Sequence, residues 1–327
     1  MAIENMARQL TLLQVEGWAA KAKGYEDFVY NSVTCEARFC NLAPTEDHRL
    51  LGVADGVRLW VVGTAGRWEP EVRGHIASVH IPVLKSNIQK SVRRGNTTTA
   101  VESTKLALLA KPEEVLRRIP VIAVEDAALI KGYSTIVWLM MSLKYRPLSQ
   151  VDAEFVCGYV AALTGCREVF AVGRQEKVTR GEITKMESSV ARTEVLAVYH
   201  RARYGGMMCD TRLLTAAAAS YYLKPENIVT VRRLPQVDVS IVDVCVSILP
   251  ESIDFHPFPR IVNSIVSASG LTKELVKQMI WQAESGVNIR KPRTLDESHI
   301  AKRSSSWDII DEYLSMERRL IRQHYHI

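Results

Sequence analysis

Three groups of residues combine side chains that could take part in chemistry, and the first is a pair of adjacent carboxylates. Glu125 and Asp126 have the side-chain type that metal-assisted reactions use. Adjacent residues on a helix point about 100° apart, so the two carboxylates would not easily serve one ion. We therefore interpret Glu125 and Asp126 as a structural ion pair, held by Arg117, Arg118 or Lys131.

The other two groups combine histidine with an acid or a thiol. Asp254 and His256, with His200 and His299 elsewhere in the chain, have the residue types of a hydrolytic metal site. No second spaced pair of ligands supports that site, and the adjacent Pro-Phe-Pro sequence favours a packing role. Cys209 with His200 has the types of a Cys/His nucleophile, but nothing in the spacing supports it. We therefore predict no catalytic site, no metal site and no cofactor, and interpret the protein as not an enzyme.

The glycines of this chain do not form a nucleotide-binding loop. A P-loop needs the pattern G-x-x-x-x-G-K-[ST], because its backbone amides wrap the phosphates at that spacing. The sequence contains neither this pattern nor a G-x-G-x-x-G after a predicted strand. An ATPase of the P-loop type is therefore excluded as an interpretation.

The composition is that of a moderately basic globular protein. The 327 residues carry a net charge of +6, and 47% of them are hydrophobic and 24% charged. This length favours about two domains. Clustered Lys and Arg could contact nucleic acid, because they release counterions from phosphates. A globular protein that happens to be basic is the alternative interpretation.

The cysteines and the apolar runs indicate where the protein works. None of the six cysteines forms a C-x-x-C motif, and their distribution indicates buried thiols in a reducing compartment. Glu4 and Arg8 interrupt the apolar core that a secretion signal needs. The longest apolar runs are too short for a bilayer or are broken by Asp238 and Asp243. We therefore expect an intracellular protein, cytoplasmic or nuclear, that is not secreted and has no membrane partner.

Helical periodicity dominates the sequence from residue 83 onward. Apolar residues recur every three to four positions over 83–92, and this helix should end at Gly95. Thr98 or Thr99 is expected to cap the next helix, and Pro112 to begin a third. Further helices are expected at 134–143, at 148–163 with Ser149 as cap, and at 186–204, 211–223, 260–268, 272–284 and 307–325.

Other segments have weaker patterns. Residues 1–24 suit a helix, whereas 28–39 and 57–63 suit strands. Pro120 predicts a kink or a short break in the helix that Pro112 begins. The Val- and Ile-rich segment 228–249 allows a strand pair or a helix, and we favour a helix with a short extended lead-in.

Together these patterns predict a mainly α fold, a multi-helix bundle with a small mixed or irregular N-terminal portion. The predicted division is a small N-terminal segment at 1–82, a helical domain at 83–172 and a second helical domain at 186–327. An extended, proline-containing connection is expected near 253–259, because prolines remove donors and restrict their neighbours.

Lysine and arginine gather at the ends of several predicted helices. At such positions the side-chain charge and the backbone can act together on a phosphate group. A solvated helix face has the same sequence pattern, so charge alone does not decide between the two. The predicted nucleic-acid contacts are Lys85, Lys90, Arg93, Arg94, Arg117, Arg118, Arg290, Lys291 and Arg293.

Residues 86–129 contain a helix with a basic end, then an Ala-rich helix, then a paired-arginine helix that leads into Glu-Asp. This order resembles the C-terminal helical region of the clamp-loader-related AAA+ ATPases of the MgsA/RarA type. The resemblance covers about residues 83–165, and the ATPase core that precedes this region in the family is absent. The matching positions are Lys90, Arg93, Arg94, Ala100, Ala107, Ala110, Arg117, Arg118, Glu125 and Asp126.

The resemblance implies an all-α module of DNA replication or repair that acts by oligomerisation and DNA-proximal contact, without ATP hydrolysis. We therefore expect a non-catalytic, nucleic-acid-associated accessory protein that oligomerises or docks protein partners. The alternative is a structural or scaffold protein of a larger assembly, viral and organellar assemblies included, without direct DNA binding. A third hypothesis, an enzyme that uses Asp254, His256 or Cys209, requires a bound metal or an activated thiol.

Overall fold

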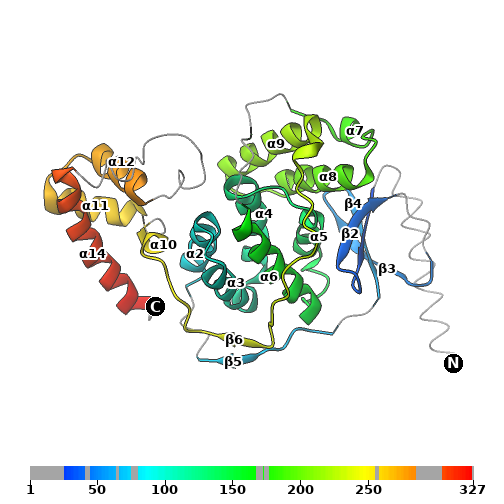
Figure 1. Cartoon of the computed structure of the whole chain (residues 1–327), viewed down its shortest axis with the longest axis horizontal. Helices are drawn as coiled ribbons and strands as arrows, with labels where there is room; N and C mark the ends of the chain where they lie inside the picture. The colour runs from blue at the N-terminus through cyan, green and yellow to red at the C-terminus, as the bar shows by residue number, and fades with distance from the viewer. Residues whose placement is uncertain are drawn as a thin grey trace.

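Helices dominate the fold, and a small mixed sheet precedes them (Figure 1). The computed structural model describes residues 26–40, 45–63, 66–74, 80–166, 172, 177–254, 258–284 and 304–325. The fold is therefore mainly α with a small mixed N-terminal portion, as the sequence predicts. In Figure 1 the N-terminal sheet and the C-terminal helices lie at opposite ends, with the main helical body between them.

The N-terminal sheet has the strand order β2-β1-β4-β3. β1 pairs antiparallel with β2 and parallel with β4, and β3 pairs antiparallel with β4. The single strand predicted at 28–39 is in fact two strands joined by a turn, and the strand predicted at 57–63 corresponds to β4. The four strands are β1 (Glu26–Asn31), β2 (Glu36–Cys40), β3 (His48–Ala54) and β4 (Val57–Val62).

The helices of the main body begin and end where local sequence signals indicate. α2 ends at Gly95, whose left-handed φ of 71° suits glycine and lets its N–H bond the last turn. Ser149 caps α6, as predicted, and forms a capping box with Asp152, whereas the cap of α3 is Asn96 and not a threonine. These helices are α2 (Ile81–Arg94), α3 (Thr97–Ala110), α4 (Pro112–Asp126), α5 (Tyr133–Ser142), α6 (Gln150–Gly165), α7 (Arg180–Ile183), α8 (Ser189–Arg203) and α9 (Met208–Leu223).

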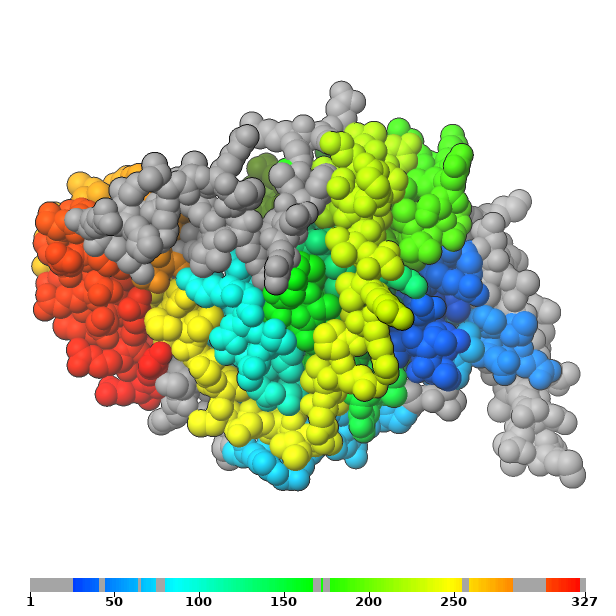
Figure 2. Space-filling view, in the orientation of Figure 1, coloured from blue at the N-terminus to red at the C-terminus, as the bar shows by residue number. Residues whose placement is uncertain are grey.

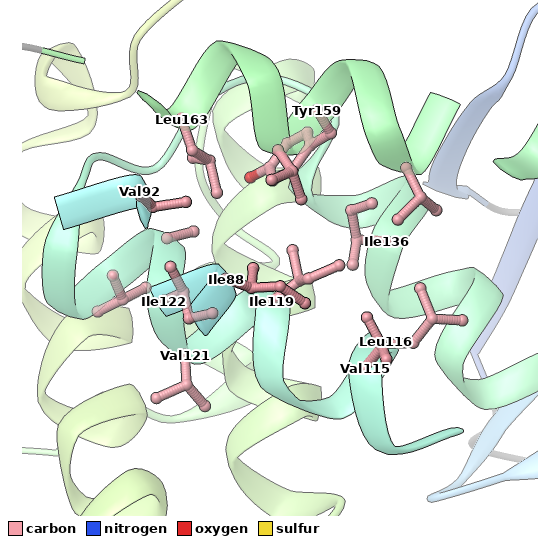
Figure 3. Close-up of a cluster of buried hydrophobic side chains, with 14 of the residues drawn as sticks. Ile88, Val92, Val115, Leu116, Ile119, Val121, Ile122, Ile136, Tyr159 and Leu163 are labelled. Atoms are coloured by element: carbon pink, nitrogen blue, oxygen red, sulfur yellow. The ribbon is translucent and has the colours of Figure 1, made fainter. Parts of the chain in front are cut away.

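The core of this body forms around α4. Leu116, Ile119 and Ile122 of α4 pack at the centre of a buried cluster to which α2, α5 and α6 contribute side chains (Figure 3). α4 runs from Pro112 to Asp126 without a break at Pro120, although proline removes one backbone donor. Burial of this apolar surface is the main stabilising contribution, at roughly 25 cal/mol per Å².

Two extended segments cross the helical body and pair with each other. β5 (Glu71–Arg73) and β6 (Ile241–Asp243) form a parallel two-stranded sheet. Just before these two strands, Trp68 donates its indole N–H to the Val239 carbonyl at 3.0 Å, which holds the same two segments together. Residues 228–249 are therefore mostly extended, and the prediction of a helix there is wrong.

The C-terminal helices include a correction to the predicted connection near 253–259. Pro250–Asp254 is helix α10, so the described part of that connection is not extended, and residues 255–257 lie outside the described residues. Proline is tolerated in the first turn of a helix because the N–H that it lacks has no partner there. The remaining helices are α11 (Phe258–Ser269), α12 (Lys273–Glu284) and α14 (Ser305–Tyr325).

The division into domains stays a prediction, and so does the helix at 1–24, which lies outside the described residues. Helices from both predicted helical domains pack together, since α8 contacts α5 and α9 contacts α4. An isolated pairing of Ile130 with Val229 adds a backbone link between the two.

Candidate functional site

Two of the cations predicted for phosphate contact, Lys90 and Arg93, lie on the inner face of α2. Lys90 and Arg93 are only 5% and 4% exposed, because this face of α2 packs against α4 and α10. Burial, followed by the charge of Arg93, lowers the pKa of Lys90 to about 7. Both side chains are almost entirely buried, so neither is placed to touch a phosphate.

Arg93 is held by the two acids at the end of α4. Its Nε lies 2.6 Å from Oδ1 of Asp126, and its Nη2 lies 3.8 Å from Oε1 of Glu125. Gln89, one turn before Arg93, donates from Nε2 to Asp126 at 2.8 Å and to Glu125 at 3.1 Å. Both carboxylates therefore converge on one side of α2, although they are adjacent on their own helix.

The same network continues to α9 through Arg118. Its Nη2 donates to Oε1 of Gln89 at 2.6 Å and lies 3.7 Å from Oε2 of Glu125. Its Nη1 contacts Asp210 of α9 at 3.2 Å. Burial and the charge of Asp126 raise the pKa of Glu125. We call this set of Gln89, Arg93, Arg118, Glu125, Asp126 and Asp210 the interhelical network.

The other predicted contacts differ in how they are placed. Lys85 pairs with Glu114 at 2.5 Å, and Arg94 pairs with Glu251 of α10 at 2.7 Å. Arg117 is exposed, and its backbone carbonyl accepts two hydrogen bonds from the buried guanidinium of Arg201. The predicted contacts that lie outside the described residues are Arg290, Lys291 and Arg293.

His200 is part of a polar cluster that the sequence did not indicate. Its Nδ1 lies 3.2 Å from Asp55, and its Nε2 lies 3.3 Å from Glu26. Burial alone would lower the pKa of His200, but its hydrogen bonds to the two carboxylates outweigh burial and raise it. Arg180 pairs with Glu26 at 3.0 Å and Arg203 with Asp55 at 3.3 Å. We call His200, Glu26 and Asp55 the His200 clamp, which ties the N-terminal sheet to α8. Because these three residues are far apart in the sequence, no local pattern indicated that they would meet.

Asp254 and Cys209 are engaged elsewhere and do not join His200. Asp254 accepts hydrogen bonds from Nε and Nη2 of Arg318 at 2.8 and 2.7 Å, and burial raises its pKa to about 6. Cys209 is exposed, with its thiol 3.6 Å from Asp210. His256 and His299 lie outside the described residues. The described members of these two candidate groups therefore serve helix packing or face solvent.

Glu194 is a buried acid that the sequence analysis did not single out. It accepts hydrogen bonds from the backbone N–H groups of Gly132 and Ser134, at 2.8 and 2.7 Å. These are the unpaired donors at the start of α5, so Glu194 of α8 caps another helix. Burial raises its pKa to about 7 despite those hydrogen bonds.

The thiols differ from the sequence prediction. All six cysteines are free, but only Cys157 is buried, whereas Cys209 and Cys245 are exposed and the other three are partly exposed. Burial raises the pKa of Cys157 to about 12, which makes its thiol inert. The prediction of buried thiols is therefore right only for Cys157.

Comparisons with known proteins leave the function to be argued from this geometry. No protein-family model, curated protein or solved structure matches the chain. Within the described ranges, no group of three or more His, Cys, Asp or Glu side chains could hold a metal ion. No helix in the part of the chain that the structure describes is long and apolar enough to cross a membrane.

Proposed function

We propose that the chain is a non-catalytic structural protein of a larger assembly, which docks protein partners and does not contact DNA through residues 86–129. The observation that carries this proposal is the interhelical network. It directs Arg93 and Arg118 of that stretch inward, where they join α2, α4 and α9 through the chain's own carboxylates. These arginines then stabilise the packing of the helices.

Phosphate binding by these cations would work against the network. DNA binding draws much of its free energy from counterions that free cations release on contact with phosphate. Arg93 would first have to leave Asp126, with both side chains only 5% exposed. Removing one partner from a buried ion pair costs about 3–5 kcal/mol. That cost exceeds the binding free energy of one phosphate contact, so a structural role for Arg93 is favoured.

A second candidate is the nucleic-acid-associated accessory protein that the resemblance implies. The specific observation in its favour is a set of exposed arginines, Arg117, Arg232 and Arg233. None of the three takes part in an ion pair within the described part of the chain. DNA would then be contacted by Arg232 and Arg233 of the extended segment before β6 and by Arg117 of α4.

A salt-dependent DNA titration separates the two candidates. Fluorescence anisotropy of a labelled duplex should detect weak binding at physiological salt that is the same for the wild type and for R117A/R232A/R233A. Tight binding, with a salt dependence that falls by about 0.9 in slope for each arginine removed, would overturn the structural role. The variant changes only exposed side chains, so circular dichroism should confirm an unchanged fold.

We propose an intracellular place for this function. All six cysteines are free thiols, and exposed free thiols such as Cys209 and Cys245 persist in a reducing compartment.

A further inference from the structure

The C-terminal helix α14 has two apolar seams, of which one is buried against neighbouring helices. The buried seam comprises Trp307, Ile310, Leu314 and Ile321, which pack toward α10, α11 and α12. α14 forms the end of the molecule opposite the N-terminal sheet and is red in Figure 2. A helix at the edge of a globular protein normally needs only one such seam.

The second seam lies on a neighbouring flank of α14, where Tyr313 still packs on the chain's own core and donates its hydroxyl to the Ala268 carbonyl at 3.3 Å. Ile309, Met316 and Leu320 are 42%, 42% and 56% exposed, and Tyr313 between them is partly exposed. Their spacing of four, three and four residues is that of the contact positions of a coiled coil. We call these four residues the exposed seam. It occupies one stripe of a 21-residue helix, about six turns long.

Charges on one flank of the exposed seam suit pairing with another helix. Glu312 and Arg319 are both exposed, and neither forms an ion pair within the described residues. They stand seven residues apart, so a rise of about 1.5 Å per residue separates them by roughly 10 Å and prevents them from pairing with each other. Each therefore offers its charge to a partner.

We propose that the exposed seam binds the exposed seam of a second copy of this chain, with the two α14 helices antiparallel. This inference rests on the proposed function, because it names the partner that such an assembly protein docks. Reversing the helix direction about a two-fold axis brings Tyr313 opposite Met316 of the second copy, and Ile309 opposite Leu320. The alternating spacing of the seam is therefore complementary to itself.

The charges select the antiparallel orientation. With the seam paired in this way, Glu312 lies beside Arg319 of the second copy, and the symmetry of the dimer repeats this pair. A parallel arrangement would instead bring Glu312 beside Glu317 of the second copy, and like charges at these positions are unfavourable. Glu317 already contacts Arg260 and Ser264 of its own chain. Four side chains per copy make a small interface, so the dimer should form only at micromolar concentrations.

Sedimentation velocity of the full chain over the micromolar range tests this inference. The wild type should pass from monomer to dimer, and Leu320→Ser should weaken the dimer by about tenfold or more, because it removes an apolar contact twice. Ser315→Ala, also on α14 but away from the seam, is the matched control and should leave the dimer unchanged. A wild type that stays monomeric, or a Leu320→Ser variant that dimerises equally well, overturns the inference.

A charge exchange tests the orientation. Glu312→Arg alone should weaken the dimer, because two guanidinium groups then face each other across the antiparallel seam. Glu312→Arg with Arg319→Glu should restore the dimer. Strengthening by Glu312→Arg alone would mean that it meets Glu317, and so would overturn the antiparallel arrangement. A failure of the dimer in these measurements would not change the result of the DNA titration. The titration therefore tests the proposed function separately.

Discussion

Replacing Arg93 with methionine should destabilise the fold far more than replacing an exposed arginine. Arg93 and Asp126 form a 2.6 Å ion pair in which both side chains are 5% exposed. Arg93→Met leaves the Asp126 carboxylate inside the protein without its guanidinium partner, although Gln89 still donates to it at 2.8 Å. Breaking a buried pair in this way costs about 3–5 kcal/mol, a large fraction of the 5–15 kcal/mol that stabilises a typical domain.

Arg73→Met is the matched control for Arg93→Met. Arg73 pairs with Glu71 at 3.0 Å, but the two side chains are 59% and 62% exposed. Such a surface pair contributes about 0–1 kcal/mol, so the two substitutions should differ by roughly 2–5 kcal/mol. Urea unfolding followed by circular dichroism measures that difference in the free energy of unfolding.

Two results would refute this reasoning. Equal losses for Arg93→Met and Arg73→Met would mean that the interhelical network contributes no more than a surface pair. Arg93→Met combined with Asp126→Leu should recover most of the loss, because apolar replacement of both partners removes the unpaired charge. A double variant less stable than Arg93→Met alone would contradict the same argument.

Two further predictions concern the contacts between distant segments. The urea midpoint of the wild type, relative to His200→Gln, should fall as the pH rises from about 6 to about 9. The pKa of His200 is raised in the folded protein, so its contribution to stability is complete below the unfolded-state pKa of 6.5 and is lost as the pH rises through the folded-state pKa. A difference in urea midpoint between the wild type and His200→Gln that stays constant with pH would contradict the His200 clamp. In α6, Gly158→Ala should cost about 1–2 kcal/mol, because the added Cβ would lie 2.5 Å from the Pro235 carbonyl oxygen. Gly165 lies in the same helix, but a Cβ added there would meet no atom within 4 Å. Gly165→Ala should therefore cause no loss of stability in thermal melting.

The helices were predictable because their signals are local. The end of α2 at Gly95 and the start of α6 at Ser149 follow from residues within one turn of each boundary. The cap of α3 was assigned to the wrong residue, since Asn96 is as good a cap as the threonines that follow it. Local chemistry thus places helices to within a few residues.

The extended segment 228–249 could not be predicted in the same way. Its Val and Ile residues suit a strand or a buried helix equally, and the choice depends on pairing with β5, about 170 residues earlier. At Gly158 the absence of a side chain lets this segment approach α6, which periodicity does not reveal. Non-local hydrogen bonds decide such segments.

The candidate site shows the same limit. Charge at the end of α2 was visible in the sequence, but not whether Arg93 points outward or toward Asp126. The His200 clamp joins residues 145 and 174 positions apart, so no spacing could have indicated it. Which cations remain free for a partner is a property of the packing between helices.

Light scattering of the full chain, with and without duplex DNA, tests the central claim most directly. At high micromolar concentration and physiological salt, we expect the mass of a dimer, and any weak DNA binding to be the same for the wild type and R117A/R232A/R233A. A monomer that gains the mass of the DNA, and loses it again in R117A/R232A/R233A, would contradict the account.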